Sequence, residues 1–226
     1  MEIAILFTGG KDSTYTVYKA IEDGFKVKRL ITIRPKKEDS YMFHTPSLEF
    51  AKIQAELMNI EHVYLDVSGE KEVEVEEAIE KIKDFVKDVK FLGIGGIRSK
   101  YQLERFEKIA KSLNLKLYVP LLNIDCIQHW KNLLSKKFKV IITSVNAYGL
   151  DESFLAKIVD EHLLNKLIEK SKIFGFDLCF EGGEAETLVL DCPLFSKEIV
   201  IEDYEIIKEN LSARVLIKKY SLKSKL

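Results

Sequence analysis

The sequence has few cysteines and no long apolar run, and both shortages restrict what the protein is. Only three of the 226 residues are cysteines, Cys126, Cys179 and Cys192. They are widely separated and lack C-x-x-C spacing, so we expect reduced thiols rather than a disulfide framework or a zinc site. No apolar run approaches the roughly 18 residues of a membrane span, and the chain enters an apolar strand at once. We therefore expect no signal peptide, no membrane association and a cytoplasmic location.

The sequence also lacks a charge imbalance. Its formal net charge at pH 7 is −1, although 31% of the residues are charged. A surface that coats nucleic acid would be strongly basic, so we expect no stable nucleic-acid partner. A hydrophobic content of 46% is typical of a globular protein. The length suits one large domain, or one domain with a smaller second one.

The most informative stretch is Thr8–Ser13, with the sequence TGGKDS. It follows the apolar run 3–7, which lacks alternation and is therefore typical of a strand buried in a parallel sheet. A helical pattern follows and stops at Gly24. Such a turn presents backbone N–H groups and a helix N-terminus, and Lys11 adds a charge suited to phosphate. An ordinary βα turn that holds a lysine is the simpler alternative, but the whole hexapeptide favours a phosphate site.

Strands and helices alternate through the first half of the chain. The apolar patterns predict further strands at 27–33, 62–67, 91–94 and 116–119, separated by helices at 45–58, 70–87 and 99–113. Thr45–Pro46 is a good helix start, because a hydroxyl N-cap precedes proline at the first helical position. We therefore predict an α/β fold with one five-stranded parallel sheet and right-handed crossovers.

The second half has a different character. Its patterns predict helices at 127–134 and 156–174 and strands at 140–145, 188–190, 199–201 and 214–220. We place a boundary between residues 119 and 123, which divides a nucleotide domain, 1–120, from a smaller mixed α/β domain, 121–226. The lysine-rich end, 218–225, is predicted to be a solvated tail.

A second glycine cluster, Gly93–Ser99, also follows a predicted strand. In an open parallel sheet the loops at the carboxyl ends of neighbouring strands meet, so this loop is expected to face Thr8–Ser13. Glycine lets the backbone approach a nucleotide, and Arg98 suits a phosphate or a carboxylate. The simpler alternative is a tight turn with a surface arginine.

The heptapeptide Glu181–Thr187, EGGEAET, holds three carboxylates among glycines. Mutual repulsion makes such a cluster costly unless a cation or the donor groups of a ligand meet it. If a strand follows directly, Glu184 and Glu186 point to the same face. A solvated acidic turn is the alternative. His44, just before the predicted helix start, suits either ligand contact or a structural role.

Thr8–Ser13 resembles the PP-loop, S-G-G-x-D-S, of the N-type ATP pyrophosphatases, with Thr8 retaining the hydroxyl of serine. Taken with other stretches, it resembles the diphthine–ammonia ligase family, in the compact form typical of archaea. The other matching stretches are 39–46 (DSYMFHTP), 93–105 with Ser99-x-Tyr101-Gln102-x-x-Arg105, 120–121 and 181–195. Two positions depart from the family pattern. Ala185 replaces an aromatic residue in E-G-G-E-[FY]-E-T, and Leu122 replaces a tryptophan.

The resemblance implies a Rossmann-like (HUP-type) three-layer α/β/α domain that uses ATP and Mg²⁺. It implies amidation of diphthine on translation elongation factor 2 with ammonium, through an adenylated carboxylate, with release of AMP and pyrophosphate. A tRNA-modifying ATP pyrophosphatase and a non-catalytic ATP or AMP sensor are the alternatives. The formation of a homodimer is left open.

The resemblance also implies three groups of site residues. The nucleotide is expected to contact Thr8, Gly9, Gly10, Lys11, Asp12, Ser13, Ile33, Gly95, Gly96 and Ile97. The expected catalytic residues are Lys11, Asp12, Glu184 and Glu186, and Asp12 is the expected Mg²⁺ ligand. The substrate is expected to contact His44, Arg98, Ser99, Tyr101, Gln102, Arg105, Glu181, Gly182, Gly183, Glu184, Glu186 and Thr187.

Overall fold

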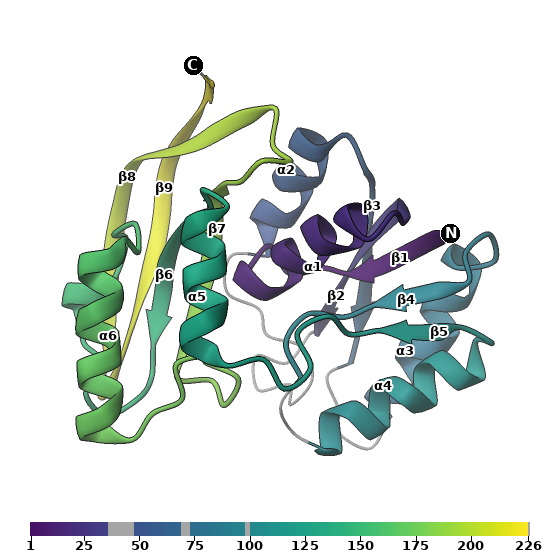
Figure 1. Ribbon diagram of the computed structural model, residues 1–226, viewed down its shortest axis with the longest axis horizontal. Coiled ribbons are helices and arrows are strands. Elements are labelled where there is room, and N and C mark those ends of the chain that lie inside the picture. Colours follow the sequence, from purple (N-terminus) through teal and green to yellow (C-terminus); the bar gives the residue numbers. More distant parts are fainter. Residues whose placement is uncertain (36–47, 69–72, 98–99, 226) are drawn as a thin grey trace. The chain divides into compact units, whose positions relative to one another are not determined.

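The computed structural model describes residues 1–35, 48–68, 73–97 and 100–225, and for Pro35, Glu74 and Tyr101 it describes the main chain alone. The chain divides into two compact units, Met1–Asn123 and Ile124–Leu226. Each unit has its own sheet and its own helices (Figure 1). No helix in the described part of the chain is long and apolar enough to cross a membrane.

The first unit contains a five-stranded parallel sheet with the strand order β3-β2-β1-β4-β5. Its strands are β1 (Glu2–Leu6), β2 (Lys26–Pro35), β3 (Glu61–Val67), β4 (Phe91–Gly93) and β5 (Lys116–Tyr118). Its helices are α1 (Lys11–Glu22), α2 (Glu49–Met58), α3 (Glu74–Ile82), the short 3-10 helix η1 (Lys83–Phe85) and α4 (Lys100–Ser112). The predicted parallel α/β sheet is confirmed.

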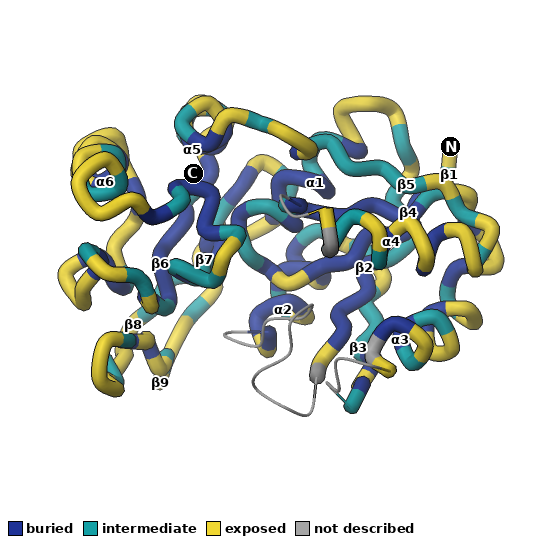
Figure 2. Tube along the Cα trace, turned by 90° about the horizontal axis from the view of Figure 1, so that it is seen from below, coloured by how far each residue is buried: buried dark blue, intermediate teal, exposed yellow. Residues whose placement is uncertain are grey.

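Helices cover both faces of this sheet. Ala4 and Leu6 of β1 lie in a buried core cluster with apolar residues of α3 and α4. Ile3 and Ile5, which alternate with them along β1, are also fully buried but lie outside that cluster. Figure 1 shows α1 and α2 on the opposite face from α3 and α4, and Figure 2 shows β1 in the dark blue of buried residues. The arrangement is the predicted three-layer α/β/α fold.

The predicted helices of this unit are present with shifted ends. The helix predicted over 70–87 is shorter, because α3 ends at Ile82 and tightens into η1. The proposed start of α2 at Thr45–Pro46 lies outside the described residues. Within α2, the predicted face is buried at Ala51 and Ala55.

The second unit has a four-stranded antiparallel sheet with the strand order β7-β6-β9-β8. Its strands are β6 (Lys139–Val145), β7 (Ala185–Asp191), β8 (Lys197–Glu209) and β9 (Ser212–Ser224). Its helices are α5 (Cys126–Ser135), the short η2 (Glu152–Phe154) and α6 (Glu161–Phe174). The fully buried indole of Trp130 on α5 donates to the Leu178 carbonyl, 2.9 Å away, and so ties α5 to the loop before β7.

Two predictions for this unit are wrong. The lysine-rich end is not a solvated tail, since residues up to Ser224 pair with β8 in β9, and Lys225 forms a 2.6 Å ion pair with Asp191. Pairing along the whole of β8 outweighs the charge of this segment. The helix predicted from residue 156 begins only at Glu161, because Ala156 and Val159 donate backbone hydrogen bonds to β6 instead.

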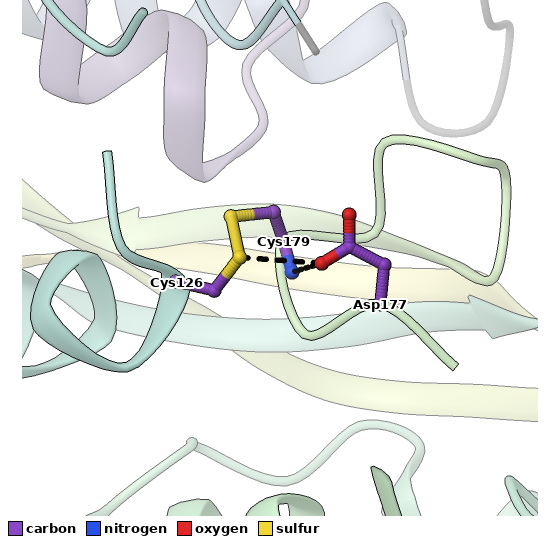
Figure 3. Close-up of side chains that lie close together, drawn as sticks. All are labelled: Cys126, Asp177 and Cys179. Carbon is purple, nitrogen blue, oxygen red and sulfur yellow. Dashed lines mark hydrogen bonds between the residues drawn. A yellow bond between two sulfur atoms is a disulfide. The ribbon is translucent and has the colours of Figure 1, made fainter. Parts of the chain in front are cut away.

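The expectation of reduced thiols is also wrong for two of the three cysteines. Cys126 and Cys179 form a disulfide across 53 residues of sequence (Figure 3). The fold, rather than the spacing of the cysteines, brings their Cα atoms to 5.1 Å. Cys192 is a free, buried thiol, and burial raises its pKa to about 12. Cys192 is therefore a reduced thiol, as predicted, and it packs as a small buried side chain.

A buried polar chain supports the carboxyl end of β1. The Thr32 hydroxyl donates to the carbonyl of Phe7, 2.6 Å away, and lies 2.8 Å from Nε2 of His62. Since the only hydroxyl proton of Thr32 goes to Phe7, Nε2 of His62 is the donor in the second bond. Burial, together with the nearby charge of Lys52, lowers the pKa of His62 from 6.5 to about 4. His62 is therefore a neutral packing residue at pH 7.

This lowered pKa predicts a loss of stability in acid. Between about pH 6.5 and pH 4 the unfolded chain binds a proton at His62 that the folded chain does not, so the free energy of unfolding falls as pH falls. We expect a contribution of about 1–2 kcal/mol at pH 4.5, less than the full shift implies because water reaches part of the ring. His62→Gln keeps a donor for Thr32 but does not titrate. Urea unfolding at pH 7 and pH 4.5 should show a smaller acid loss for this variant, and equal losses would contradict the assignment.

Candidate active site

The candidate nucleotide site lies at the carboxyl ends of β1 and β4, which are neighbours in the sheet. From β1 the chain crosses to β2 on one side, whereas β4 continues to β5 on the other. The loops that leave these two strands therefore diverge and open a crevice at the edge of the sheet. Thr8–Ser13 follows β1, and the glycine cluster follows β4.

Gly9 shapes the first loop. Its φ of +80° lies in the left-handed region, which favours glycine. The carbonyl of Gly9 accepts a hydrogen bond from Nε2 of Gln54, 2.9 Å away on α2. A Cβ at Gly9 would lie only 2.2 Å from the Gln54 amide oxygen, so the position admits no side chain without moving Gln54. A fully buried amide from another helix thus fixes the loop.

Two hydroxyls close the loop on itself. The Ser13 hydroxyl accepts from the backbone amide of Thr8 at 3.2 Å and donates to the carbonyl of Gly10 at 3.3 Å. It also lies 3.1 Å from the Thr8 hydroxyl. The two hydroxyls therefore contact each other across the loop. These bonds hold the loop in one shape.

The loop leads into the N-terminus of α1. Gly10 is the N-cap residue and supplies no side-chain cap, so a bound anion has backbone N–H groups and the positive end of the helix dipole to meet. Lys11, the first helical residue, has a side chain only 2% exposed, and its ammonium group lies 2.6 Å from the Asp12 carboxylate. A buried lysine at the start of a helix places a fixed positive charge beside the crevice.

The glycine loop after β4 touches the first loop, as predicted. A Cβ at Gly95 would lie 3.0 Å from the Ser13 amide nitrogen and 3.2 Å from the Asp12 carbonyl carbon. The two backbones therefore approach more closely than a side chain allows. The side chains of Ile33 and Ile97 lie in the core cluster with α3 and α4, so the predicted contact of these residues with the nucleotide would use the main chain and stays a prediction.

The substrate residues predicted in this unit are only partly described. His44, Arg98 and Ser99 lie outside the described residues, and Tyr101 is described by its main chain alone. Gln102 and Arg105 are half-buried on α4. A hydrogen bond from Lys108 and, to a smaller extent, the charge of Arg105 lower the pKa of the Glu76 carboxyl on α3. Arg105 therefore lies close to α3, and its contact with substrate stays a prediction.

The acidic heptapeptide lies in the second unit, just before and within β7. One carboxylate oxygen of Glu184 accepts from the Gly182 amide at 2.8 Å, and the Glu184 carbonyl accepts from the Asn146 amide at 2.8 Å. Gly183 has a φ of +81° and donates to the Phe180 carbonyl. Glu184 therefore shapes the turn, and it lies outside the strand, so strand alternation does not place it with Glu186.

Three other residues of the heptapeptide are partly accessible to solvent, whereas Ala185 is buried. Glu181, Glu186 and Thr187 are half-buried, and Glu186 pairs with Ser144 of β6. The glycines leave the turn without bulky side chains, so a cationic group can approach the carboxylates. These residues form a candidate acidic site in the second unit.

The residues present in the first unit fit a nucleoside triphosphate. The glycine backbones, the uncapped helix N-terminus and the buried lysine form a cradle of the kind that holds phosphate. The carboxylate of Asp12 is a suitable ligand for a divalent cation, but it already forms an ion pair with the ammonium group of Lys11. Mg²⁺ binding by Asp12 therefore stays a prediction.

Gln54 was missed by sequence reasoning, although a signal for it exists. It is the polar member of the buried face of α2, between Ala51 and Ala55, and it is 0% exposed. A glutamine on an apolar helical face needs a buried partner, and here that partner is the Gly9 carbonyl.

Comparison with known proteins identifies the family. A family model described as "Diphthamide synthase N-terminal domain" matches residues 1–117, and one described as "Diphthamide synthase C-terminal domain" matches residues 127–223. The chain belongs to the diphthamide synthase family. The resemblance to this family is thereby confirmed, along with the enzyme class predicted from it, an ATP-dependent amide-forming ligase.

Members of this family from several eukaryotes are similar to the chain. The "Diphthine--ammonia ligase" of Homo sapiens is 31% identical over 94% of this chain and 87% of its own length. That of Danio rerio is 30% identical over 92% of this chain and 89% of its own length. The Saccharomyces cerevisiae relative is 27% identical over 86% of this chain, which matches only 33% of that longer protein.

A solved structure also resembles the chain. It is described as "The crystal structure of predicted subunit of tRNA methyltransferase from Methanocaldococcus jannaschii DSM" and superposes with a TM-score of 0.46. The two chains are 18% identical, and the match covers 85% of this chain and 98% of the other.

The contact between the two glycine loops predicts the effect of a methyl group at Gly95. Gly95→Ala must push apart backbone atoms near Asp12 and Ser13, so we expect the affinity for ATP to fall about tenfold. Calorimetric titration with ATP measures the change.

Gly24→Ala is the matched control for Gly95→Ala. Gly24 has a φ of +83°, and no atom lies within 4 Å of the position that a Cβ would take, so this substitution costs only backbone strain, about 1 kcal/mol of stability. Its ATP affinity should equal that of the unmodified protein. If Gly95→Ala binds ATP as tightly as the unmodified protein does, the two loops do not jointly form the nucleotide site.

Proposed function

We propose that this protein catalyses the last step of diphthamide synthesis, the ATP-dependent amidation of diphthine on translation elongation factor 2 with ammonium. The observation that carries this proposal is the cradle at the ends of β1 and β4, in which Lys11 lies buried beside a glycine backbone and a helix N-terminus. Family membership supports the substrate, because the related proteins are named diphthine–ammonia ligase.

The chemistry requires activation of a carboxylate. A carboxylate is a poor acyl donor, so an oxygen of the diphthine carboxylate attacks the α-phosphorus of ATP and pyrophosphate leaves. Ammonia then attacks the acyl carbon, the C–O bond to AMP breaks, and the amide forms. In the first step the N–H groups at the start of α1 and the ammonium of Lys11 offset the charge that develops on pyrophosphate. Magnesium, held with the help of Asp12, would supply further positive charge.

The acidic heptapeptide is assigned to the acceptor half of the reaction. Diphthine carries a quaternary ammonium group, and the second reactant is ammonium, so both are cations. The carboxylates of Glu184 and Glu186 suit the binding of such a cation, or the removal of a proton from ammonium. Glu184 is held in place by the Gly182 amide.

An oxygen-label experiment tests the adenylate directly. The protein is incubated with ATP, ammonium and diphthine-bearing elongation factor 2 whose carboxylate carries heavy oxygen. One AMP and one pyrophosphate should form per amide, and the label should appear in AMP. Release of ADP and phosphate would contradict the mechanism. AMP and pyrophosphate formed only with tRNA would indicate a tRNA-modifying enzyme, and ATP binding without turnover a nucleotide sensor.

A further inference from the structure

Two cysteines and a carboxylate meet in the second unit, and none of the three belongs to the phosphate cradle or the acidic heptapeptide. Cys126 is the first residue of α5, and Cys179 lies in the loop between α6 and β7. The donor atoms of Cys126, Cys179 and Asp177 all lie within 4.8 Å of one another (Figure 3). Both cysteines are nearly buried, with exposed fractions of 9% and 4%.

The position of Asp177 distinguishes the Cys126–Cys179 pair from a disulfide with a purely structural role. Its Oδ1 accepts from the backbone amide of Cys179 at 3.0 Å and lies 3.2 Å from the Cys126 sulfur. That geometry is a hydrogen bond only when the sulfur carries a proton, and therefore only when the pair is reduced. The fold thus provides a favourable contact for the dithiol as well as a short bridge for the disulfide.

The helix N-terminus at Cys126 offsets part of the repulsion that a thiolate there meets from the Asp177 carboxylate. The N-terminus of a helix stabilises negative charge, and Cys126 occupies the first position of α5 directly after its N-cap, Asp125. Cys179 is the more buried of the two and is placed to attack second. The two residues therefore have different exposures and different surroundings.

We propose that Cys126 and Cys179 form a reversible thiol–disulfide site in which Asp177 accepts the proton of Cys126. The oxidant is a small-molecule disulfide, RSSR, and the reductant is a dithiol. Asp177 takes the Cys126 proton, the thiolate attacks RSSR, and one RSH leaves. The sulfur of Cys179 then attacks the mixed disulfide at Cys126 and forms the protein disulfide, while the proton of Cys179 passes to the departing RS⁻, which leaves as the second RSH. Two protein thiols are oxidised and one RSSR is reduced to two RSH.

The disulfide bears on the acidic heptapeptide through the segment that follows Cys179. The carbonyl of Phe180, the next residue, accepts from the Gly183 amide within the heptapeptide. The Phe180 ring also contacts Trp130 of α5, with a centroid separation of 6.0 Å. The covalent bond therefore anchors to α5 the chain that enters the acidic turn, and reduction removes that anchor. The Trp130 indole retains its bond to the Leu178 carbonyl, so reduction loosens the turn without unfolding the unit.

Redox titration of the native protein tests reversibility. The protein is equilibrated in buffers with graded ratios of glutathione to glutathione disulfide, and its thiols are alkylated and mapped by mass spectrometry. We expect Cys126 and Cys179 to change together from dithiol to disulfide, and Cys192→Ser to leave that change unaltered. A disulfide that resists excess dithiol in the folded protein, or a dithiol that glutathione disulfide never oxidises, would overturn the proposal.

The role of Asp177 is tested by the pH profile of oxidation. Asp177→Asn retains an oxygen that can accept from the Cys179 amide but cannot take a proton. We expect its oxidation to be about tenfold or more slower at pH 7 and to approach the normal rate at about pH 9–10, where thiolate forms without a base. Asp160→Asn, a matched change at the N-cap of α6, should have no effect. Slow oxidation of Asp177→Asn at every pH would reject Asp177 as the proton acceptor.

Two further measurements complete the test. Hydrogen exchange of residues 180–184 should be faster in the reduced protein, and identical exchange would show that the disulfide does not anchor the acidic turn. The reduced protein is also titrated with Zn²⁺, because two thiolates and a carboxylate are zinc ligands. Binding of one Zn²⁺ that prevents oxidation by glutathione disulfide would make the cluster a metal site and overturn the proposal.

Discussion

Lys11→Ala should reduce the formation of AMP and pyrophosphate about 10²–10³-fold, the loss that follows removal of one preorganised charge from a transition state. The ammonium of Lys11 is buried and lies at the N-terminus of α1, so water does not replace it easily. Its partner Asp12 is partly exposed and can be solvated after the substitution. The fold should therefore survive, with most of the loss in kcat. Quantification of AMP and pyrophosphate by chromatography measures the effect.

Lys19→Ala is the matched control for Lys11→Ala. Lys19 lies two turns further along α1, where it forms ion pairs with Glu22 and Asp23 at 2.9 Å. Its removal takes the same charge from the same helix, but far from the loop. Activity should stay within about twofold of the unmodified protein, since exposed ion pairs contribute little. If both variants lose activity equally, the overall charge of α1, rather than the position of Lys11, would be responsible.

The contact between the two glycine loops could be predicted because its determinants are local in sequence. Each glycine loop directly follows an apolar strand, and the chirality of βα units then decides which strand ends meet. The contact between Gly95 and the backbone at Ser13 follows from those rules. Gln54 could not be placed in the same way, since its partner at Gly9 is 45 residues away in the chain.

The second unit was harder to predict because its elements depend on contacts between distant segments. Cys126 and Cys179 carry no spacing signal, and only the packing of α5 against the loop before β7 joins them. The charged end of the chain is a strand because β8 offers it thirteen residues of partner backbone. The local charge and the intrinsic strand propensity of this segment have a smaller effect on its structure than this pairing has.

We expect the acidic heptapeptide to serve amide formation and the phosphate cradle to serve ATP binding, and a second substitution tests this assignment. Glu186→Gln should lower amide formation about 10²-fold, because a neutral amide neither attracts a cation nor accepts its proton. Its affinity for ATP should stay within about threefold, since Glu186 lies in the second unit and the phosphate cradle in the first. Amide formation by mass spectrometry and ATP binding by calorimetry measure the two effects separately. Equal losses of ATP affinity and amidation would show that Glu186 also serves the nucleotide.

Two substitutions of Glu184 separate the effect of its charge from its effect on the shape of the turn. Its carboxylate accepts from the Gly182 amide, and glutamine can accept the same bond without the charge, whereas alanine removes both. If the charge acts on a cationic substrate, Glu184→Gln and Glu184→Ala should both lose amidation, and only the alanine variant should show faster hydrogen exchange at residues 182–184. Full activity of Glu184→Gln would leave Glu184 with a structural role alone. Glu205→Gln removes an exposed charge on β8 whose ion-pair partner is Lys218 of β9, so it should leave amidation and exchange unchanged.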